Sequence, residues 1–250
     1  MKVLFILTLA VIAASAEHYP TDEEALLAEE GAGKFEGDID EDPNSPDLFN
    51  AMTNRARRWA NGVVPFVIHS EFPSAVRTRI LDGINTLNRQ TAIGGRACLN
   101  IRPRTNERDY ILVRRLQGCF SRIGRSGGAQ TLSIGRGCER IGTVMHEFLH
   151  ALGFYHEQSR SDRDNFVTIN WSNIRRGTEG NFRKLAVGRI DLLGTNYNYN
   201  SVMHYGAYAF AINRRVRTIV PRDSNANIGQ RTRLDALDIR RVQIFYECNR

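Results

Sequence analysis

Cysteine, histidine and long apolar runs are scarce in this sequence of 250 residues, and each scarcity excludes something. The four cysteines never stand at CxxC spacing, which argues against a zinc site built from thiolates. Only one long apolar run is present, Val3–Ala14, and it is too short to span a bilayer, so we expect no transmembrane anchor. The sequence has no internal repeat and no RNP-like aromatic pattern, and we therefore expect no specific nucleic-acid partner.

The N-terminal apolar run has the features of a secretory signal peptide. Lys2 precedes it, and Ala14-Ser15-Ala16 forms a small-x-small cleavage site. We therefore expect residues 1–16 to direct a secreted, extracellular protein. With 42% hydrophobic residues, the chain is long enough for one well-buried domain or two small ones.

Three of the six histidines lie within one short segment, HEFLHALGFYH (146–156). Because a helix repeats every ~3.6 residues, His146 and His150 project from one face and can share a metal ion, with Glu147 beside them. Gly153 can end the helix in a left-handed conformation and return the chain, so that His156 supplies a third ligand. Three neutral imidazoles leave one position of a tetrahedral Zn²⁺ open, which is typical of a catalytic site.

A chance set of histidines on an amphipathic helix is the alternative, and a second motif argues against it. SVMHY (201–205) follows an Asn- and Tyr-rich loop, and HExxHxxGxxH with a downstream methionine turn is the metzincin signature. Met203 is expected to pack beneath the metal rather than bind it, since Zn²⁺ prefers nitrogen, oxygen and thiolate ligands to a thioether. His204 is assigned no role.

Together, HEFLHALGFYHE (146–157) and SVMHY resemble the astacins, the metzincin branch that includes tolloids, meprins and hatching enzymes. The resemblance runs from about Phe35 to the last cysteine and is greatest to single-domain, hatching-type members. It includes WANGVVPF (59–66), FYHEQSRSDRDNFVTIN (154–170) and IGQRTRL (228–234). It implies an α+β, metzincin-type zincin fold. A twisted mixed sheet and two long helices would form the N-terminal half, a loop-rich C-terminal half would end in a helix, and the active-site cleft would lie between them.

The resemblance also implies a role for each site residue. His146, His150 and His156 bind one Zn²⁺, and Glu147 is the general base of a zinc metalloendopeptidase that hydrolyses polypeptides. Tyr205 is a further zinc ligand in the resting enzyme and swings away to hydrogen-bond the developing oxyanion. A turn residue with a solvated hydroxyl is the alternative for Tyr205. We expect the protein to be a monomer.

Because we expect a secreted protein, we also expect the four cysteines to form disulfides. Four cysteines allow three pairings, and the sequence does not show which of them forms. The resemblance favours Cys119 with Cys138, and Cys98 with Cys248. The chain ends two residues after Cys248, so we expect no EGF-like or CUB-like module after it.

Charge is segregated sharply along the chain. Residues 17–49 contain twelve acidic residues and one lysine, a net charge of −11. Residues 50–250 contain 32 basic and 15 acidic residues, a net charge of +17. An acidic leader on a basic body suggests an intramolecular pro-segment, and a disordered acidic linker is the alternative.

Phe35-Glu36-Gly37-Asp38 favours the pro-segment over the linker. It resembles the FxGD motif of astacin propeptides, in which the aspartate takes the zinc position that water needs, so Asp38 is the expected inhibitory ligand. A carboxylate is a competent Zn²⁺ ligand, and a glycine lets the backbone approach a crowded cleft. We therefore expect a zymogen that needs an activating protease.

The resemblance places the mature start at Asn50, which makes residues 17–49 the propeptide and residues 50–250 the catalytic domain. It also implies that the freed N-terminus folds inward to Glu157. Cleavage after Arg55, Arg57 or Arg58 is the alternative and would remove that contact.

Hydrophobic periodicity predicts the order of elements in the expected catalytic domain. It indicates helices at 74–90, 138–152 and 235–246, strands at 63–68, 99–102, 110–113 and 129–134, and a loop-rich segment at 162–219. We expect a polypeptide substrate to lie extended along an edge strand near Gly127–Ile134. Arg231 and Arg233 resemble a tolloid and meprin segment and imply a preference for an acidic residue after the scissile bond.

Two alternative functions, each from a different class of protein, stay open. One is a secreted zinc-bearing binding module without activity, although every residue needed for catalysis is in place. The other is a polyanion binder that uses the basic body through counterion release, for which an ordinary solvated surface is the commoner explanation.

Overall fold

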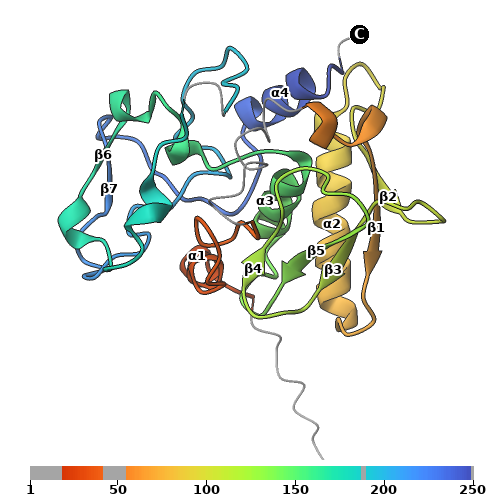
Figure 1. Cartoon of the computed structure of the whole chain (residues 1–250), viewed down its shortest axis with the longest axis horizontal. Helices are drawn as coiled ribbons and strands as arrows, with labels where there is room; N and C mark the ends of the chain where they lie inside the picture. The colour runs from red at the N-terminus through yellow and green to blue at the C-terminus, as the bar shows by residue number, and fades with distance from the viewer. Residues whose placement is uncertain (1–18, 42–54, 187–189, 249–250) are drawn as a thin grey trace, which may run out of the picture.

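The computed structural model describes residues 19–41, 55–186 and 190–248, so the expected signal peptide and the expected mature start at Asn50 lie outside the described residues. Figure 1 shows a half that contains the sheet and the long helices, and a second half made mainly of loops and short 3₁₀ turns. The short helix α1 (Asp22–Glu30) lies between them. Among the described residues, no helix has the length and apolar character needed to cross a membrane.

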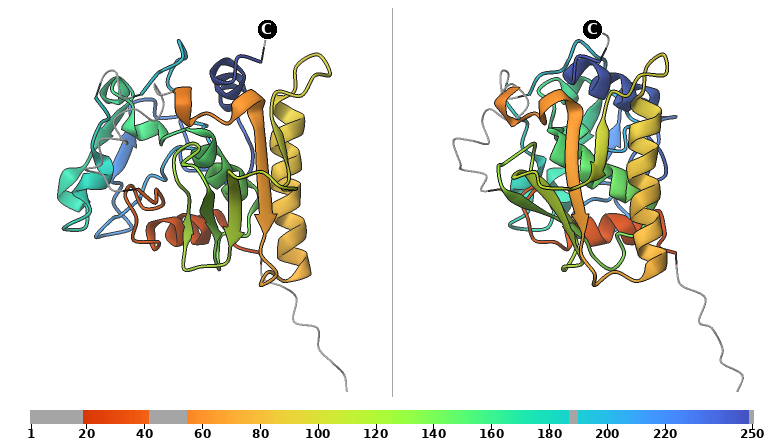
Figure 2. Two further views of the ribbon diagram at one scale, coloured as in Figure 1. Left: turned by 45° about the vertical axis from the view of Figure 1, so that its right-hand side comes forward. Right: turned by 90° about the vertical axis from the view of Figure 1, so that its right-hand side faces the viewer.

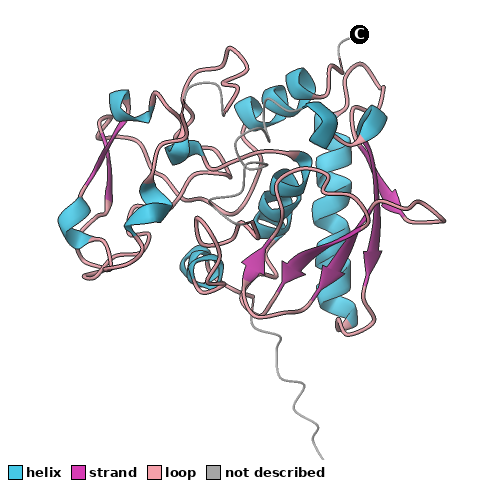
Figure 3. Ribbon diagram, viewed as in Figure 1, coloured by secondary structure: helices cyan, strands magenta, loops and turns pink. Residues whose placement is uncertain are grey.

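The main sheet has five strands in the order β2-β1-β3-β5-β4 (Figure 3). Four of them are parallel: β1 (Val63–Ile68), β2 (Asn100–Pro103), β3 (Tyr110–Arg114) and β5 (Ala129–Ile134). The two-residue strand β4 (Cys119–Phe120) pairs antiparallel with the end of β5 and makes the sheet mixed.

The placement of the edge strand corrects one expectation. We predicted that residues 127–134 form the edge against which a substrate lies, but β5 is an inner strand between β3 and β4. The edge of the sheet is β4, which the periodicity did not reveal because two residues are too few to show an alternating pattern.

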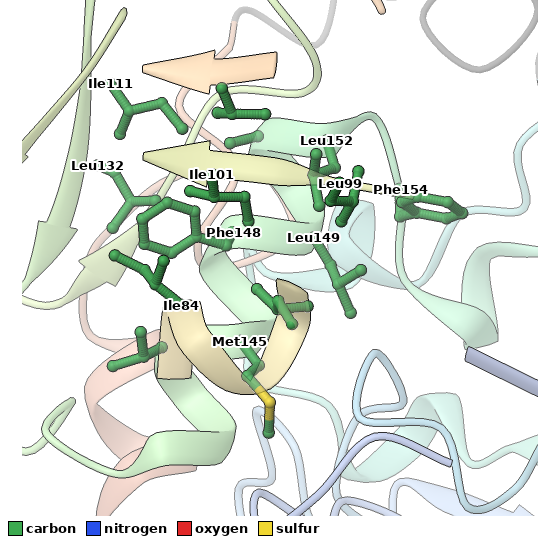
Figure 4. Close-up of a cluster of buried hydrophobic side chains, with 14 of the residues drawn as sticks. Ile84, Leu99, Ile101, Ile111, Leu132, Met145, Phe148, Leu149, Leu152 and Phe154 are labelled. Carbon is green, nitrogen blue, oxygen red and sulfur yellow. The ribbon is translucent and has the colours of Figure 1, made fainter. Parts of the chain in front are cut away.

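Two helices cover the sheet and form the main core with it. α2 (Ser74–Thr91) places buried side chains at helical spacing, and it runs alongside β1 in Figure 2. α3 (Ile141–Leu152) packs against α2 and is buried along nearly its whole length. Figure 4 shows how Ile84 of α2 and Phe148 of α3 meet the strand residues Ile111 and Leu132. This packing fixes α3, which carries the histidine motif.

The loop-rich half contains a two-stranded antiparallel sheet, β6 (Val167–Ile169) with β7 (Ile219–Pro221), which periodicity did not predict. A smaller aromatic core holds this half together and includes Phe182, Tyr205 and Phe210. The chain then enters α4 (Ala236–Phe245), whose N-cap Asp235 forms a capping box with Asp238, the third residue of the helix.

Helix α1 was not predicted, although a local signal for it exists. Thr21 accepts a hydrogen bond from the N–H of Glu24, and the Glu24 carboxylate accepts one from the N–H of Thr21. This Thr-x-x-Glu capping box marks a helix start. Charge is the most evident property of this acidic segment, and charge does not indicate a helix.

Two disulfides tie distant parts of the chain together, in the pairing that the resemblance implied. Cys98 bonds to Cys248 and joins the region before β2 to the end of α4. Cys119 bonds to Cys138 and joins β4 to the loop before α3.

The end of α3 generates a prediction about stability. Gly153 has φ 111° in the left-handed region, as predicted, and its N–H donates to the carbonyl groups of His150 and Leu149. An L side chain in that conformation costs about 1–2 kcal/mol, and a Cβ there would also lie 3.1 Å from the ring of Phe245. We expect Gly153→Ala to lower the free energy of unfolding by at least this amount in urea denaturation.

Gly180 provides the matched control. It lies outside the left-handed region, and an added Cβ would meet no atom within 4 Å. Gly180→Ala should leave the urea midpoint nearly unchanged, and an equal loss in both variants would contradict the role given to Gly153.

Candidate active site

Helix α3 and the turn after it bring the three motif histidines to one buried point. His146, His150 and His156 are each fully buried. The first two lie one helical turn apart, and the left-handed cap at Gly153 returns the chain so that His156 faces them. The three histidines are therefore brought together by one helix and the turn after it, which are local features of the sequence.

A hydrogen bond fixes the outer nitrogen of each imidazole. Nδ1 of His146 lies 2.8 Å from the carbonyl oxygen of Val202, and Nδ1 of His150 lies 2.7 Å from that of Phe154. Nδ1 of His156 lies 2.7 Å from Oε2 of Glu36. Because all three partners are acceptors, each Nδ1 carries the proton and each Nε2 presents a lone pair.

The three Nε2 atoms converge on a space that suits a metal ion. Nε2 of His146 lies 3.1 Å from that of His150 and 3.3 Å from that of His156. Ligands about 2.0–2.1 Å from a tetrahedral Zn²⁺ are separated by roughly 3.3 Å, so the spacing fits this ion. Three lone pairs that face one another in this way suit a bound cation.

Asp38 of the acidic segment completes the group. Its Oδ2 lies 3.1 Å from Nε2 of His146, and its Oδ1 lies 3.4 Å from Nε2 of His150 and 3.3 Å from Nε2 of His156. Asp38 and the three histidines form a cluster whose ligand atoms all lie within 4.8 Å of one another. Burial alone would raise the pKa of Asp38, but its interactions with the three histidines hold it well below its usual range.

The acidic segment also binds through Glu36, which sequence reasoning passed over. Besides its contact with His156, Glu36 accepts a hydrogen bond from Ser159 at 2.8 Å. Its backbone carbonyl accepts one from the hydroxyl of Tyr205 at 2.5 Å. Glu36 has φ 47° and Gly37 has φ 84°, so a sharp bend aims Glu36 and Asp38 into one site. The only sequence signal for this role of Glu36 was its position inside the FxGD motif.

The backbone of the acidic segment follows the edge strand of the sheet. The N–H of Ser121 donates to the carbonyl of Asp38 at 2.9 Å, and the N–H of Asp40 donates to the carbonyl of Ser121 at 2.8 Å. The resulting bridge between Ile39 and Ser121, the residue after β4, is parallel. The segment therefore pairs with the chain just beyond β4, and not with residues 127–134, where we expected a bound polypeptide.

Glu147 lies beside the histidine cluster and is fully buried. Neither of its carboxylate oxygens has a hydrogen-bond partner among the described residues. Burial raises the pKa of Glu147 well above its usual value, and the charges of Asp38 and Glu29 act in the same direction. A carboxyl group held in this way is poised to exchange a proton with a ligand in the cleft.

The methionine turn forms the wall of the site. The hydroxyl of Ser201 donates to Asp238 at 2.6 Å, and buried Met203 belongs to the main core. Burial lowers the pKa of His204 to about 3, so its ring is neutral. Nδ1 of His204 donates to the carbonyl of Tyr205 at 2.8 Å, and Nε2 accepts from the hydroxyl of Tyr197 at 2.7 Å. His204 therefore holds the turn that carries Tyr205.

Glu157 follows the third histidine and is buried against the last helix. Its carboxylate makes a bidentate ion pair with Arg241 and accepts a hydrogen bond from the N–H of Asn198 at 2.7 Å. The N-terminus that we expected to bind Glu157 lies outside the described residues.

The two arginines of the expected subsite lie in different surroundings. Arg231 is fully buried, and its guanidinium binds both oxygens of Glu29 of α1 at 2.7 and 2.6 Å. Glu29 in turn lies within 4.8 Å of ligand atoms of His146 and Glu147, so Arg231 reaches the metal site. Arg233 is exposed and makes no ion pair among the described residues. No sequence signal distinguished Glu29 from its acidic neighbours.

Comparison with known proteins places this geometry in a family. The family model for astacin, a family of peptidases, matches residues 51–247. Zinc metalloproteinase nas-13 of Caenorhabditis elegans is 40% identical over 200 residues, which are 80% of this chain and 43% of that protein. High choriolytic enzyme 1 of Oryzias latipes is 42% identical over 196 residues, which are 77% of this chain and 69% of that protein. The chain thus spans less than half the length of nas-13.

Solved structures agree with the sequence matches. The structure of high choriolytic enzyme 1, a hatching enzyme zinc-protease from medaka fish, superimposes with a TM-score of 0.69 and covers 76% of this chain and 93% of that chain. Myroilysin, at 18% identity and a TM-score of 0.53, shares the fold. The expected α+β metzincin fold is confirmed, and this chain belongs to the astacin family of zinc metalloproteinases.

Proposed function

We propose that the protein is a secreted zinc endopeptidase made as a latent proenzyme. Residues 1–16 would be the signal peptide, residues 17–49 the pro-segment and residues 50–250 a monomeric catalytic domain. The observation that supports this most strongly is the carboxylate of Asp38, which comes from the acidic segment and lies among three Nε2 atoms spaced for Zn²⁺.

The site residues divide the chemistry between them. His146, His150 and His156 would hold Zn²⁺, which when bound polarises the scissile carbonyl and lowers the pKa of water. Glu147 accepts the proton of the attacking water and passes it to the leaving amine. Its raised pKa and its lack of a fixed partner among the described residues suit both steps.

Tyr205 stabilises the negative charge that develops on the substrate. Its hydroxyl donates a hydrogen bond to the oxygen of the scissile carbonyl, which matters most when water is excluded. In the latent form that hydroxyl is bound to the carbonyl of Glu36. The pro-segment therefore takes up both the metal position and the oxyanion donor, and its removal frees them together.

Activation would need a protease that cuts near Asn50 or after a nearby arginine. The resemblance to the family has the new N-terminus approach Glu157. In the latent form that carboxylate makes an ion pair with Arg241, which holds it in place until the N-terminus arrives.

The substrate is a polypeptide that adds a strand at β4, where the pro-segment backbone binds Ser121. Arg231 would recognise an acidic residue just after the scissile bond. Arg231 is the better candidate for this role than Arg233, since it is the one that binds a carboxylate beside Glu147.

Glu147→Gln tests the catalytic role directly. We expect the processed variant to keep one Zn²⁺, because the three histidines are untouched, and to lose about 10²–10⁴-fold in kcat because an amide does not accept the proton. Zinc content by elemental analysis and casein cleavage measure the two effects. In the parent enzyme a chelator should abolish cleavage and zinc should restore it. A metal-replete variant with normal turnover would overturn the assignment, and a parent with no metal-dependent cleavage would favour a binding module.

Asp38→Ala tests latency. The contacts of Glu36 and Glu29 remain, so the pro-segment should stay docked while the metal position opens, and the full chain should show measurable activity before processing. Asp40→Ala is the matched control, since Asp40 pairs with Lys34 at 2.7 Å and its backbone bond to Ser121 does not need the side chain. Full chains of both variants that are equally silent would show that Asp38 is not the inhibitory ligand.

Peptides that differ only in Asp or Asn just after the scissile bond test the role of Arg231. A charge-assisted hydrogen bond should favour Asp by about tenfold to a hundredfold in kcat/KM. Arg231→Gln should remove the preference and Arg233→Gln should keep it, with circular dichroism as a check that both variants fold. A preference that survives Arg231→Gln in a folded enzyme would place the specificity elsewhere.

A further inference from the structure

Glu30, the last residue of α1, binds guanidinium groups other than that of Arg231. Oε2 of Glu30 lies 3.1 Å from a guanidinium nitrogen of Arg175 and 3.2 Å from one of Arg214. Two guanidinium groups from separate loops therefore converge on one carboxylate, whose side chain is only 8% exposed.

The loops that carry these donors are held together without the help of α1. Ile174 and Ala211 form an antiparallel bridge, and the N–H of Arg175 donates to the carbonyl of Phe210 at 2.9 Å. The N–H of Ile212 donates to the carbonyl of Asn173 at 2.8 Å. The two arginines are thus positioned by the loop-rich half itself, so that their arrangement persists when α1 leaves.

The other acidic residues of α1 show that this contact is selective. Asp22 pairs with Arg140 at the opposite end of the helix, and Glu23 is exposed and makes no ion pair among the described residues. Glu29 and Glu30 lie at the end of α1, which runs between the two halves (Figure 1), and each meets guanidinium groups from later in the chain. Consecutive residues of α1 therefore occupy two anionic positions, of which that of Glu29 lies beside the metal site.

We propose that Arg175 and Arg214 form a second anion-binding subsite of the processed enzyme. It rests on the proposed peptidase function, and it adds to the subsite of Arg231. The substrates that fit best are polypeptides with two carboxylates close together, one for each subsite, and the pro-segment holds both subsites with Glu29 and Glu30 until it is removed.

The physical basis is charge compensation at a partly dry site. Burial raises the pKa of Glu30, while the N–H of Phe210 and the charges of Arg214 and Arg175 act against that rise. A substrate carboxylate that enters the same place meets the same two guanidinium groups. Since Arg175 and Arg214 stay 49% and 38% exposed, we expect a moderate effect of about threefold to tenfold.

A peptide scan with the enzyme processed from the full chain tests the proposal. Each fluorogenic peptide keeps Asp just after the scissile bond, and a second Asp is moved through three positions on either side, with Asn as its matched partner. We expect one position to raise kcat/KM by about threefold to tenfold for Asp over Asn, and added salt should reduce that gain because the pair is partly exposed.

Two double variants of equal charge identify the residues responsible. Arg175→Gln with Arg214→Gln should abolish the gain from the second Asp and keep the preference for the first. Arg176→Gln with Arg215→Gln removes two exposed arginines next in sequence that make no ion pair among the described residues, and it should keep both. In the full chain, Glu30→Gln should speed activation by a protease, whereas Glu23→Gln should not.

The outcomes separate this proposal from the function on which it rests. Metal-dependent cleavage with no favoured position for a second Asp would overturn the subsite while leaving the peptidase intact. An equal loss in both double variants would mean that overall charge, and not these two residues, attracts acidic peptides. Absence of any metal-dependent cleavage would instead overturn the proposed function itself.

Discussion

The structure depends on one constraint, the fixing of three imidazole protons on their outer nitrogens. Val202, Phe154 and Glu36 each hold an Nδ1, so that three Nε2 lone pairs face one space. Such an arrangement suits a bound cation, and the contact of His146 with Val202 joins the two halves at that point. The carbonyl of Val202 belongs to the loop-rich half and the helix α3 to the sheet half. The same interaction therefore builds the metal centre and sets the cleft in which it lies.

The acidic segment supplies negative charge to a cleft that is lined by histidine and arginine side chains. Its residues do so in three distinct ways. Asp38 lies at the metal position, Glu36 accepts hydrogen bonds from His156 and Ser159, and Glu29 and Glu30 bind one buried and two exposed arginines. The charge difference between the two parts of the chain is thus resolved into specific contacts. A disordered linker of the same composition would provide only a diffuse attraction.

The sequence predicted the parts of the fold and of the site that local rules govern. The spacing of His146 and His150, the left-handed cap at Gly153 and the long helix 74–90 follow from periodicity and capping, and the structure has them. Strand β4 was missed because two residues carry no alternation. Glu29 and Glu36 were missed because a carboxylate in an acidic run has no local mark that shows its partner. Partners 120 to 202 residues away along the chain arise only from the tertiary fold.

The carboxylate of Asp38 also has a thermodynamic meaning. As a proposed ligand it binds the metal and the pro-segment at once, so the two equilibria are linked. Whatever factor the ion adds to the affinity of the segment, the docked segment must add to the affinity of the ion. A chain that folds without its metal would hold its own inhibitor less tightly. Under the proposed latency, binding of the ion would therefore be a condition for inhibition as well as for catalysis.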